Sequence, residues 1–348
     1  DSLECLQPEL DIIGRDARVH VHPYGAISQG EKGEELADLA ALAPYVPGFS
    51  DDGRGVQSQE MMRRAMLLAR ELDRPIVAHC EDESLLSKGW CVHDGEFARR
   101  HGLPGNNPAS EWKQVERDIQ LVRETGCRYH ICHISTKESV ALVRSAKAEG
   151  LPVTCETGPH YLVLCDEELQ DDGRFKMNPP IRSAADRDAL VAGLLDGTID
   201  CIATDHAPHS AEEKAQGLRG SLNGVVGLEC AFPVLYTELV KPGNIPLEII
   251  LNALCVNPRR IFRLPGGHIE AGQPADLTVL SLDHSGVVDP RTFRSLGRAT
   301  PFAGRHVDAA VCMTLVGGKI AFPERLEPSS SGTIGIIQGF DCPEGGRA

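Results

Sequence analysis

Four side chains able to bind a divalent metal ion stand at the ends of strand-like segments of this chain. Asp52 follows a short apolar run, His79 and His133 close two further runs, and Asp205 ends a fourth. Carboxylate oxygens and imidazole nitrogens are typical ligands of zinc and similar ions. Each group alone also has a structural explanation, because aspartates cap helices and buried histidines are often satisfied within the core. Four such groups at four strand ends favour a metal site.

Strands that alternate with helices must position these groups. Short apolar runs predict the strands, and apolar residues at helical spacing predict the helices. Such alternation is typical of a parallel sheet. The predicted strands are 18–22, 46–50, 75–79, 128–133, 152–156 and 200–204, and the predicted helices include 33–42, one capped by Ser58, 109–124, 137–148 and 185–195.

Polar groups at so many consecutive strand ends favour an α/β fold of the TIM type, because a (β/α)8 barrel gathers its strand ends into one ring. Only six strands precede the helical region, and an open barrel would expose two unpaired edges. We therefore expect that strands 3 to 8 of the barrel are visible. Two further βα units should precede Asp1, so the chain is expected to be amino-terminally incomplete.

The carboxyl-terminal third has a different pattern. Residues 228–262 are predicted to be helical, with Asn257-Pro258 as a stop. Antiparallel strands are predicted at 275–280 and 313–322, around a turn at Gly317-Gly318. The expected domains are an incomplete barrel at 15–265, part of a small β-sandwich at 266–326 and a loosely ordered tail at 327–348, which is rich in Ser, Gly and Pro.

Composition excludes several classes of function. A net charge of −15 over 348 residues argues against nucleic acid as a partner, since phosphate binding needs a basic face. The chain has no apolar run of about 18 residues and no signal-peptide pattern, so we expect no membrane partner. Its 12 cysteines form no CxxC pair, and several sit in apolar runs, which favours free thiols and a cytoplasmic location.

Several motifs together resemble the dihydroorotases of the amidohydrolase superfamily. They occur in order across about residues 15–322, and they match the bacterial branch whose bridging metal ligand is an aspartate rather than a carboxylated lysine. The main motifs are His79-Cys80-Glu81-Asp82, His130–Thr136, Lys176–Pro180 and Ala203–His209, and shorter ones occur at 23–27, 49–53 and 301–302.

The resemblance implies a zinc-dependent hydrolase that converts (S)-dihydroorotate reversibly to N-carbamoyl-L-aspartate in pyrimidine biosynthesis. Two Zn²⁺ or similar ions would activate water and polarise the ring carbonyl. Asp52 would bridge them, with Asp51 as the less favoured neighbour. The other implied roles are His79 and His133 as ligands of one ion, Asp205 as ligand of the other and as proton shuttle, and Asn178, His209 and Gly224 as substrate-binding residues.

The sequence departs from the family pattern in three places. The first-strand His-x-His and the nearby substrate-binding Arg and Asn are missing, so half of one metal site is not in this chain. His20-Val21-His22 has the right spacing, but it precedes the third-strand motif at 23–27, and we do not assign it. Leu222-Asn223-Gly224 replaces Pro-Phe-Gly in a substrate-covering loop, and Pro159-His160-Tyr161 replaces Pro-His-His, which leaves the role of His160 open.

Two alternatives remain. Dihydropyrimidinase, hydantoinase and allantoinase bridge their metals with a carboxylated lysine, whereas no lysine lies near Asp51-Asp52. A non-catalytic subunit that scaffolds aspartate transcarbamoylase would be expected to lose metal ligands, yet every ligand expected in this stretch is present. A homodimer and an association with aspartate transcarbamoylase are both left open.

Overall fold

A parallel four-stranded sheet lies at the centre of the computed structural model, which describes residues 1–323. Its strand order is β1-β4-β5-β6, and each strand pairs in parallel with its neighbour. The sheet confirms the predicted alternation of strands and helices. Its strands are β1 (Ile76–Ala78), β4 (Tyr129–Ile131), β5 (Val153–Thr157) and β6 (Cys201–Ile202).

Single parallel bridges extend the sheet beyond β1. Phe49 bridges Ile76 on one side and Gly25 on the other, so the order along the sheet continues the order of the chain. The predicted strand at 18–22 is wrong, because residues 17–24 form no strand and pairing begins only at Gly25. The alternation there failed as a signal because no neighbouring strand covers Val19 and Val21, which are 49% and 43% exposed.

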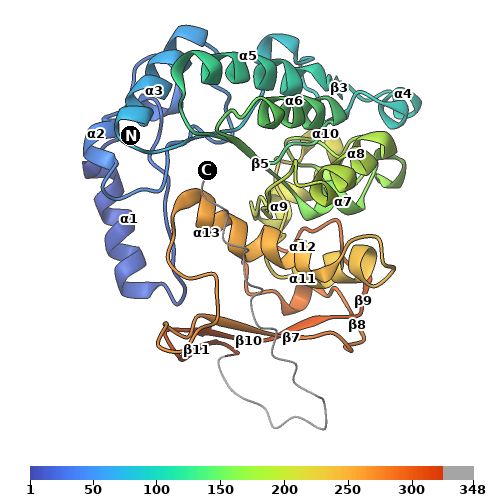
Figure 1. The fold of residues 1–348 in the computed structure, drawn as a ribbon. Helices are drawn as coiled ribbons and strands as arrows, with labels where there is room; N and C mark the ends of the chain where they lie inside the picture. The colour runs from blue at the N-terminus through green and yellow to red at the C-terminus, as the bar shows by residue number, and fades with distance from the viewer. Residues whose placement is uncertain (324–348) are drawn as a thin grey trace.

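Four amphipathic helices pack in sequence against one another along the outside of the sheet (Figure 1). Three of them begin where Ser58, Thr136 and Ser183 accept hydrogen bonds from backbone N–H groups of the first turn, whereas the fourth follows Pro108 and has no side-chain cap. All four match predicted helices. They are α3 (Gln59–Glu71), α5 (Ala109–Thr125), α6 (Lys137–Ala148) and α8 (Ala184–Leu195).

Shorter elements connect this framework. The helix predicted at 33–42 is wrong in extent, because Asp38 caps a single turn, α2 (Leu39–Leu42), and the residues before it are irregular. A longer helix, α1 (Leu3–Asp16), begins the chain, and further short elements are β2 (Val92–His93), α4 (Glu96–His101), β3 (Gly105–Asn106), α7 (Pro159–Val163), α9 (Ala211–Lys214) and α10 (Gly217–Gly220).

The helical region predicted at 228–262 is confirmed in part, because residues 228–230 and 241–246 are turns or irregular, and Asn257-Pro258 does not stop the helix. A π-helical turn at 252–256 runs directly into α13 (Asn257–Phe262), and Pro258 lies in the first turn, where its missing N–H costs little. The other helices here are α11 (Ala231–Leu235), which continues into a π-helical turn at 236–240, and α12 (Leu247–Leu251).

A small antiparallel sheet lies on the far side of these helices in Figure 1. Its order is β11-β10-β7, and Gly317 and Gly318, with φ of 55° and 76°, form the predicted turn. The domain limits stay predictions, and the tail at 327–348 lies outside the described residues. The strands are β7 (Leu277–Ser281), β10 (Ala310–Val316) and β11 (Lys319–Phe322), with a separate pair β8 (Gly286–Val287) and β9 (His306–Val307).

The helices of the described part include none that is both long and apolar enough to cross a bilayer.

Phe49 lies between Gly25 and β1 in the sheet, three residues before Asp52, and its ring is fully buried. We expect Phe49→Ala to lower the free energy of unfolding by about 3–5 kcal/mol, because a large buried ring leaves a cavity. Urea denaturation of the metal-free protein measures this change. Tyr45→Ala is the control, because Tyr45 is 48% exposed, and its effect should stay within about 0.5 kcal/mol. Equal effects of the two substitutions would contradict the packing role of Phe49.

Candidate metal centre

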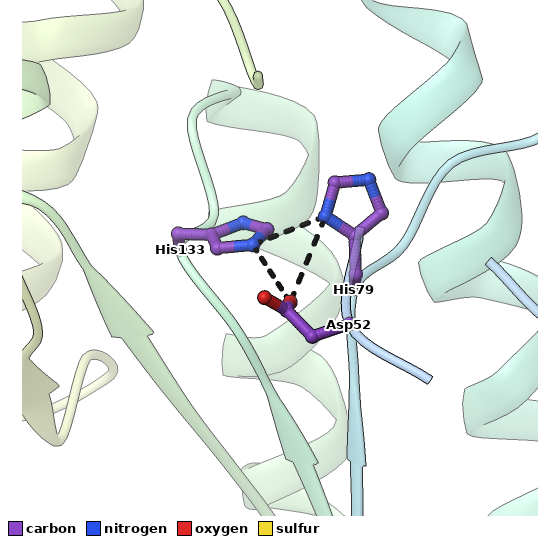
Figure 2. A group of neighbouring side chains, drawn as sticks. All are labelled: Asp52, His79 and His133. Atoms are coloured by element: carbon purple, nitrogen blue, oxygen red, sulfur yellow. Dashed lines mark hydrogen bonds and ion pairs between the residues drawn. The ribbon is translucent and has the colours of Figure 1, made fainter. Parts of the chain in front are cut away.

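Asp52, His79 and His133 converge at the carboxyl end of the parallel sheet (Figure 2). They follow Phe49, β1 and β4, which are neighbours in the sheet, so three short strand ends bring them together. His79 Nδ1 lies 3.1 Å from His133 Nε2, and Asp52 Oδ1 lies 4.0 Å and 3.5 Å from those two nitrogens. The structure thus gathers three of the four predicted ligands.

The spacing of these three atoms fits one divalent metal ion. Ligand atoms in a tetrahedral zinc site, each about 2.0–2.1 Å from the ion, are about 3.3 Å apart. The two imidazole nitrogens and the carboxylate oxygen lie close to that spacing, within 4.8 Å of one another. Both histidine side chains are nearly inaccessible, whereas the Asp52 side chain is 59% exposed. A cation bound there would have two fixed ligands and one open side.

The adjacent carboxylates of Asp51 and Asp52 serve different purposes. Asp51 is buried and accepts hydrogen bonds from the backbone N–H groups of Ile27 and Ser28, at 2.7 Å and 3.0 Å, and from the Ser28 hydroxyl. Its oxygens are therefore committed to the backbone. The carboxylate of Asp52 instead faces the two histidines, which agrees with its preference over Asp51 as the predicted ligand.

A second carboxylate stands behind His79. Because His79 Nδ1 faces the other ligands, its Nε2 faces Glu81, whose Oε2 is 3.8 Å away. Glu81 accepts hydrogen bonds from Asn178 Nδ2 at 3.1 Å and from buried Asn106 Nδ2 at 3.3 Å. At 3.8 Å the contact of Glu81 with His79 is electrostatic rather than a hydrogen bond, and Asn178 Nδ2 lies nearer to His79 Nε2, at 3.4 Å. We did not assign Glu81 a role from the sequence, although it lies two residues after His79.

Strained backbone marks two strand ends at the site. His133 has φ of 32° and Asp205 has φ of 47°, both in the left-handed region that residues with a Cβ rarely adopt. Such strain costs about 1–3 kcal/mol per residue and is found mainly where function fixes a side chain. The turn after β4 and the turn after β6 are therefore shaped to direct these two side chains.

Charge coupling within the cluster is strong. Partial burial opposes ionisation of Asp52, but its contact with His133 and the charges of both histidines outweigh this and lower its pKa to about 2. Burial likewise opposes protonation of His133, yet Asp52 and Asp205 raise its pKa to about 10. Burial raises the pKa of Asp205, with the charge of His133 acting in the opposite direction. At neutral pH the metal-free cluster holds a carboxylate and a protonated imidazole.

Asp205 is coupled to the cluster electrostatically but is not one of the three clustered ligands. The side-chain nitrogen of Asn178 contacts Glu81 and His79, which links this residue to the cluster. Its Oδ1 is buried and has no hydrogen-bond partner among the described residues. That orphaned acceptor faces no protein donor and is available to a ligand N–H.

The other two predicted substrate residues, His209 and Gly224, lie in two segments that contact each other. His209 Nε2 bonds to the carbonyl of Asn223 at 2.7 Å, and its Nδ1 lies 3.4 Å from Glu213. The N–H of Gly224 donates to the carbonyl of Lys176 at 3.1 Å, so a substrate contact by this amide requires that hydrogen bond to change. His209 and Gly224 are thus adjacent, and their roles stay predictions.

Two other histidine positions lie apart from the cluster. His20 pairs with Asp276 at 2.9 Å and thereby binds the amino-terminal segment to the antiparallel sheet region. His160 is fully buried, its Nε2 has no partner among the described residues, and burial lowers its pKa to about 3. The charge of His133 acts in the same direction, so His160 is neutral at pH 7, and its role stays open.

Comparisons with known proteins agree on one family. A family model described as Dihydro-orotase-like matches residues 1–139. The chain is 52% identical to a dihydroorotase of Brevibacillus brevis over 92% of this chain and 76% of the relative. It is 51% identical to a dihydroorotase of Bacillus caldolyticus, over 92% and 75%, and 45% identical to one of Fusobacterium nucleatum, over 94% and 77%.

Solved structures give the same α/β fold. The L-hydantoinase (dihydropyrimidinase) of Arthrobacter aurescens superposes with a TM-score of 0.80 at 25% identity, over 97% of this chain and 76% of that one. A D-hydantoinase structure gives a TM-score of 0.76 at 20% identity, over 92% and 74%. These structural likenesses concern the fold.

Substitutions of the two adjacent aspartates should have different effects, one on zinc affinity and the other on stability. Asp52→Asn should weaken Zn²⁺ binding at least about 100-fold, because it removes a charged ligand. Asp51→Asn should instead lower the free energy of unfolding by about 3 kcal/mol, because it disturbs three buried hydrogen bonds. Zinc competition titration and urea denaturation of both variants test this. A larger loss of zinc affinity in the Asp51 variant would contradict the assignment.

Metal binding should release a proton. Since the pKa of His133 is about 10 and that of Asp52 is about 2, His133 is protonated at pH 7 and Asp52 is not. A metal ion must displace the proton on His133 Nε2, so affinity should rise from pH 6 toward pH 9. Calorimetry in two buffers of different ionisation enthalpy should give about one proton per ion.

The matched control for that titration is His306→Asn, an exposed histidine of β9, which should leave the proton count unchanged. Metal binding without any proton release in the unmodified protein would show that His133 is neutral before the ion arrives.

Proposed function

The chain belongs to the dihydroorotase family, and from this premise we propose that the residues at the carboxyl end of its parallel sheet carry out the reversible hydrolysis of (S)-dihydroorotate to N-carbamoyl-L-aspartate. The observation that supports this most directly is the convergence of Asp52, His79 and His133. A subunit with only a scaffolding role would have no need to keep three metal ligands in contact. The absence of a lysine beside Asp52 sets the site apart from a lysine-bridged cyclic amidase.

Two zinc ions are the cofactors that we propose. His79 Nδ1 and His133 Nε2 would hold one ion, Asp52 would bridge to the other, and Asp205 would be a ligand of that other ion. The distances within the cluster and the carboxylate behind His79 support the first assignment. When bound, the ions lower the pKa of water and polarise the ring carbonyl.

The protein groups would then bind the ring and move one proton. Asn178 Oδ1, which has no partner among the described residues, is suited to accept a hydrogen bond from a ring N–H. His209 would bind the substrate carboxylate, and Gly224 would line the same side of the pocket. Asp205 would accept a proton from the attacking water and return it to the leaving nitrogen, a role that its raised pKa favours.

Membership of this family also bears on the fold, the location and the partners of the chain. We propose that the parallel sheet is part of a (β/α)8 barrel, with β1, β4, β5 and β6 extended by the bridges at Phe49 and Gly25. Free thiols support a cytoplasmic location, because eight buried cysteines are unpaired. A homodimer or an association with aspartate transcarbamoylase stays a prediction.

Asp205→Asn in the zinc-loaded, full-length protein tests the proton role. Loss of the basic oxygen should lower kcat for dihydroorotate hydrolysis about 10²- to 10⁴-fold. The ion held by His79 and His133 should remain, as measured by zinc content. Asp188→Asn, an exposed aspartate of α8, is the matched control and should retain full activity. Retained hydrolysis in the Asp205 variant would remove this residue from the proton transfer.

A further inference from the structure

The side chain of Lys214 ends in a cage of backbone carbonyl groups. Lys214 lies at the end of α9 and is 6% exposed. Its Nζ is 3.0 Å from the carbonyl oxygen of Lys176, 2.7 Å from that of Leu222 and 2.7 Å from that of Gly224. An ammonium group has three donors and no acceptor. All three donors are therefore used, and all three go to the main chain.

These three carbonyls belong to the two segments that carry the proposed substrate residues. Lys176 lies two residues before Asn178, and Leu222 and Gly224 flank Asn223, whose own carbonyl bonds to His209. The carbonyl of Lys176 also accepts the N–H of Gly224. One ammonium group thus joins the irregular segment that presents Asn178 to the loop that presents Gly224.

The charge of Lys214 has no carboxylate partner within ion-pair distance among the described residues. Burial of an ammonium group without a counter-ion is costly unless its hydrogen bonds are satisfied in full. Burial and the nearby charge of Lys176 lower the pKa of Lys214 to about 8, which agrees with this environment. An apolar side chain of similar length would leave the carbonyls of Leu222 and Gly224 without this donor, so the ammonium group is what holds the two segments together.

Gly224 adds a second constraint on the loop. Its φ is 127°, and a Cβ at this position would lie 2.6 Å from the carbonyl oxygen of Ala207 and 3.1 Å from His209 Nε2. The loop therefore approaches the Asp205–His209 segment as closely as a glycine allows.

We propose that Lys214 is a positioning residue that sets the height of the 222–224 loop over the substrate, relative to Asn178 and His209. This inference rests on the proposed function. Without its three contacts the loop would move away from Asn178, and the substrate would be bound more weakly. The metal ligands, which belong to other strand ends, would be unaffected.

Lys214→Met tests the proposal, because methionine keeps the apolar stem and removes all three donors. In the zinc-loaded full-length protein we expect KM for dihydroorotate to rise about tenfold, with kcat changed less than about twofold and zinc content unchanged. Lys214→Arg keeps the charge but its planar fork cannot reach the same three carbonyls, so KM should rise by a smaller factor. Lys241→Met, at an exposed lysine, is the control and should leave KM unchanged.

A purely structural role predicts a lower melting temperature with KM unchanged, and that result in either Lys214 variant would overturn the proposal. If the Met variant does not fold, the Arg variant alone decides. Asn178→Ala and His209→Ala are measured in parallel. If they leave KM unchanged, the proposed substrate site is wrong; if they raise KM while the Lys214 variants do not, only the positioning role is wrong.

Discussion

The contact between one carboxylate and two imidazoles at adjacent strand ends is the constraint on which the rest of the structure depends. Asp52, His79 and His133 place a negative charge, a protonated ring and a second ring nitrogen within 4.8 Å of one another. In a parallel sheet neighbouring strands end on the same side, so this juxtaposition requires only that each ligand follow its strand closely. Helix α3 packs against β1 and α6 against β5, and α5 packs between these two helices.

A layer of buried polar groups supports this contact. Glu81 Oε2 lies 3.8 Å from His79 Nε2 and accepts a hydrogen bond from Asn178 Nδ2, so one carboxylate contacts both a candidate metal ligand and a proposed substrate residue. Asp51 binds the chain around Ile27 and thereby fixes the turn that presents Asp52. Buried polar groups are stabilising only when their hydrogen bonds are complete. The unpartnered Oδ1 of Asn178 therefore indicates a position at which a bound ligand can donate a hydrogen bond.

Much of the arrangement was predictable from the sequence. The strands at β1, β4 and β5 and the helices α3, α5, α6 and α8 follow from periodicity and caps. The candidate ligands Asp52, His79 and His133 follow from their positions after short apolar runs. The strand at 18–22 failed because alternation does not reveal whether a partner strand is present, and the helix at 33–42 failed because a cap at Asp38 started it late. Asn257-Pro258 misled because Pro258 lies in the first turn of α13, where a proline does not interrupt the helix. Lys214 and Glu81 could not be predicted, since their partners are carbonyls and side chains brought close only by the fold.

The central claim is that Asp52, His79 and His133 together bind one catalytic metal ion. A crystal structure of the zinc-loaded protein, with anomalous data at the zinc edge, tests it directly. We expect an anomalous peak about 2.0–2.2 Å from His79 Nδ1, His133 Nε2 and an oxygen of Asp52. A peak ligated by Asp51, or zinc bound elsewhere with these three side chains unliganded, would contradict it.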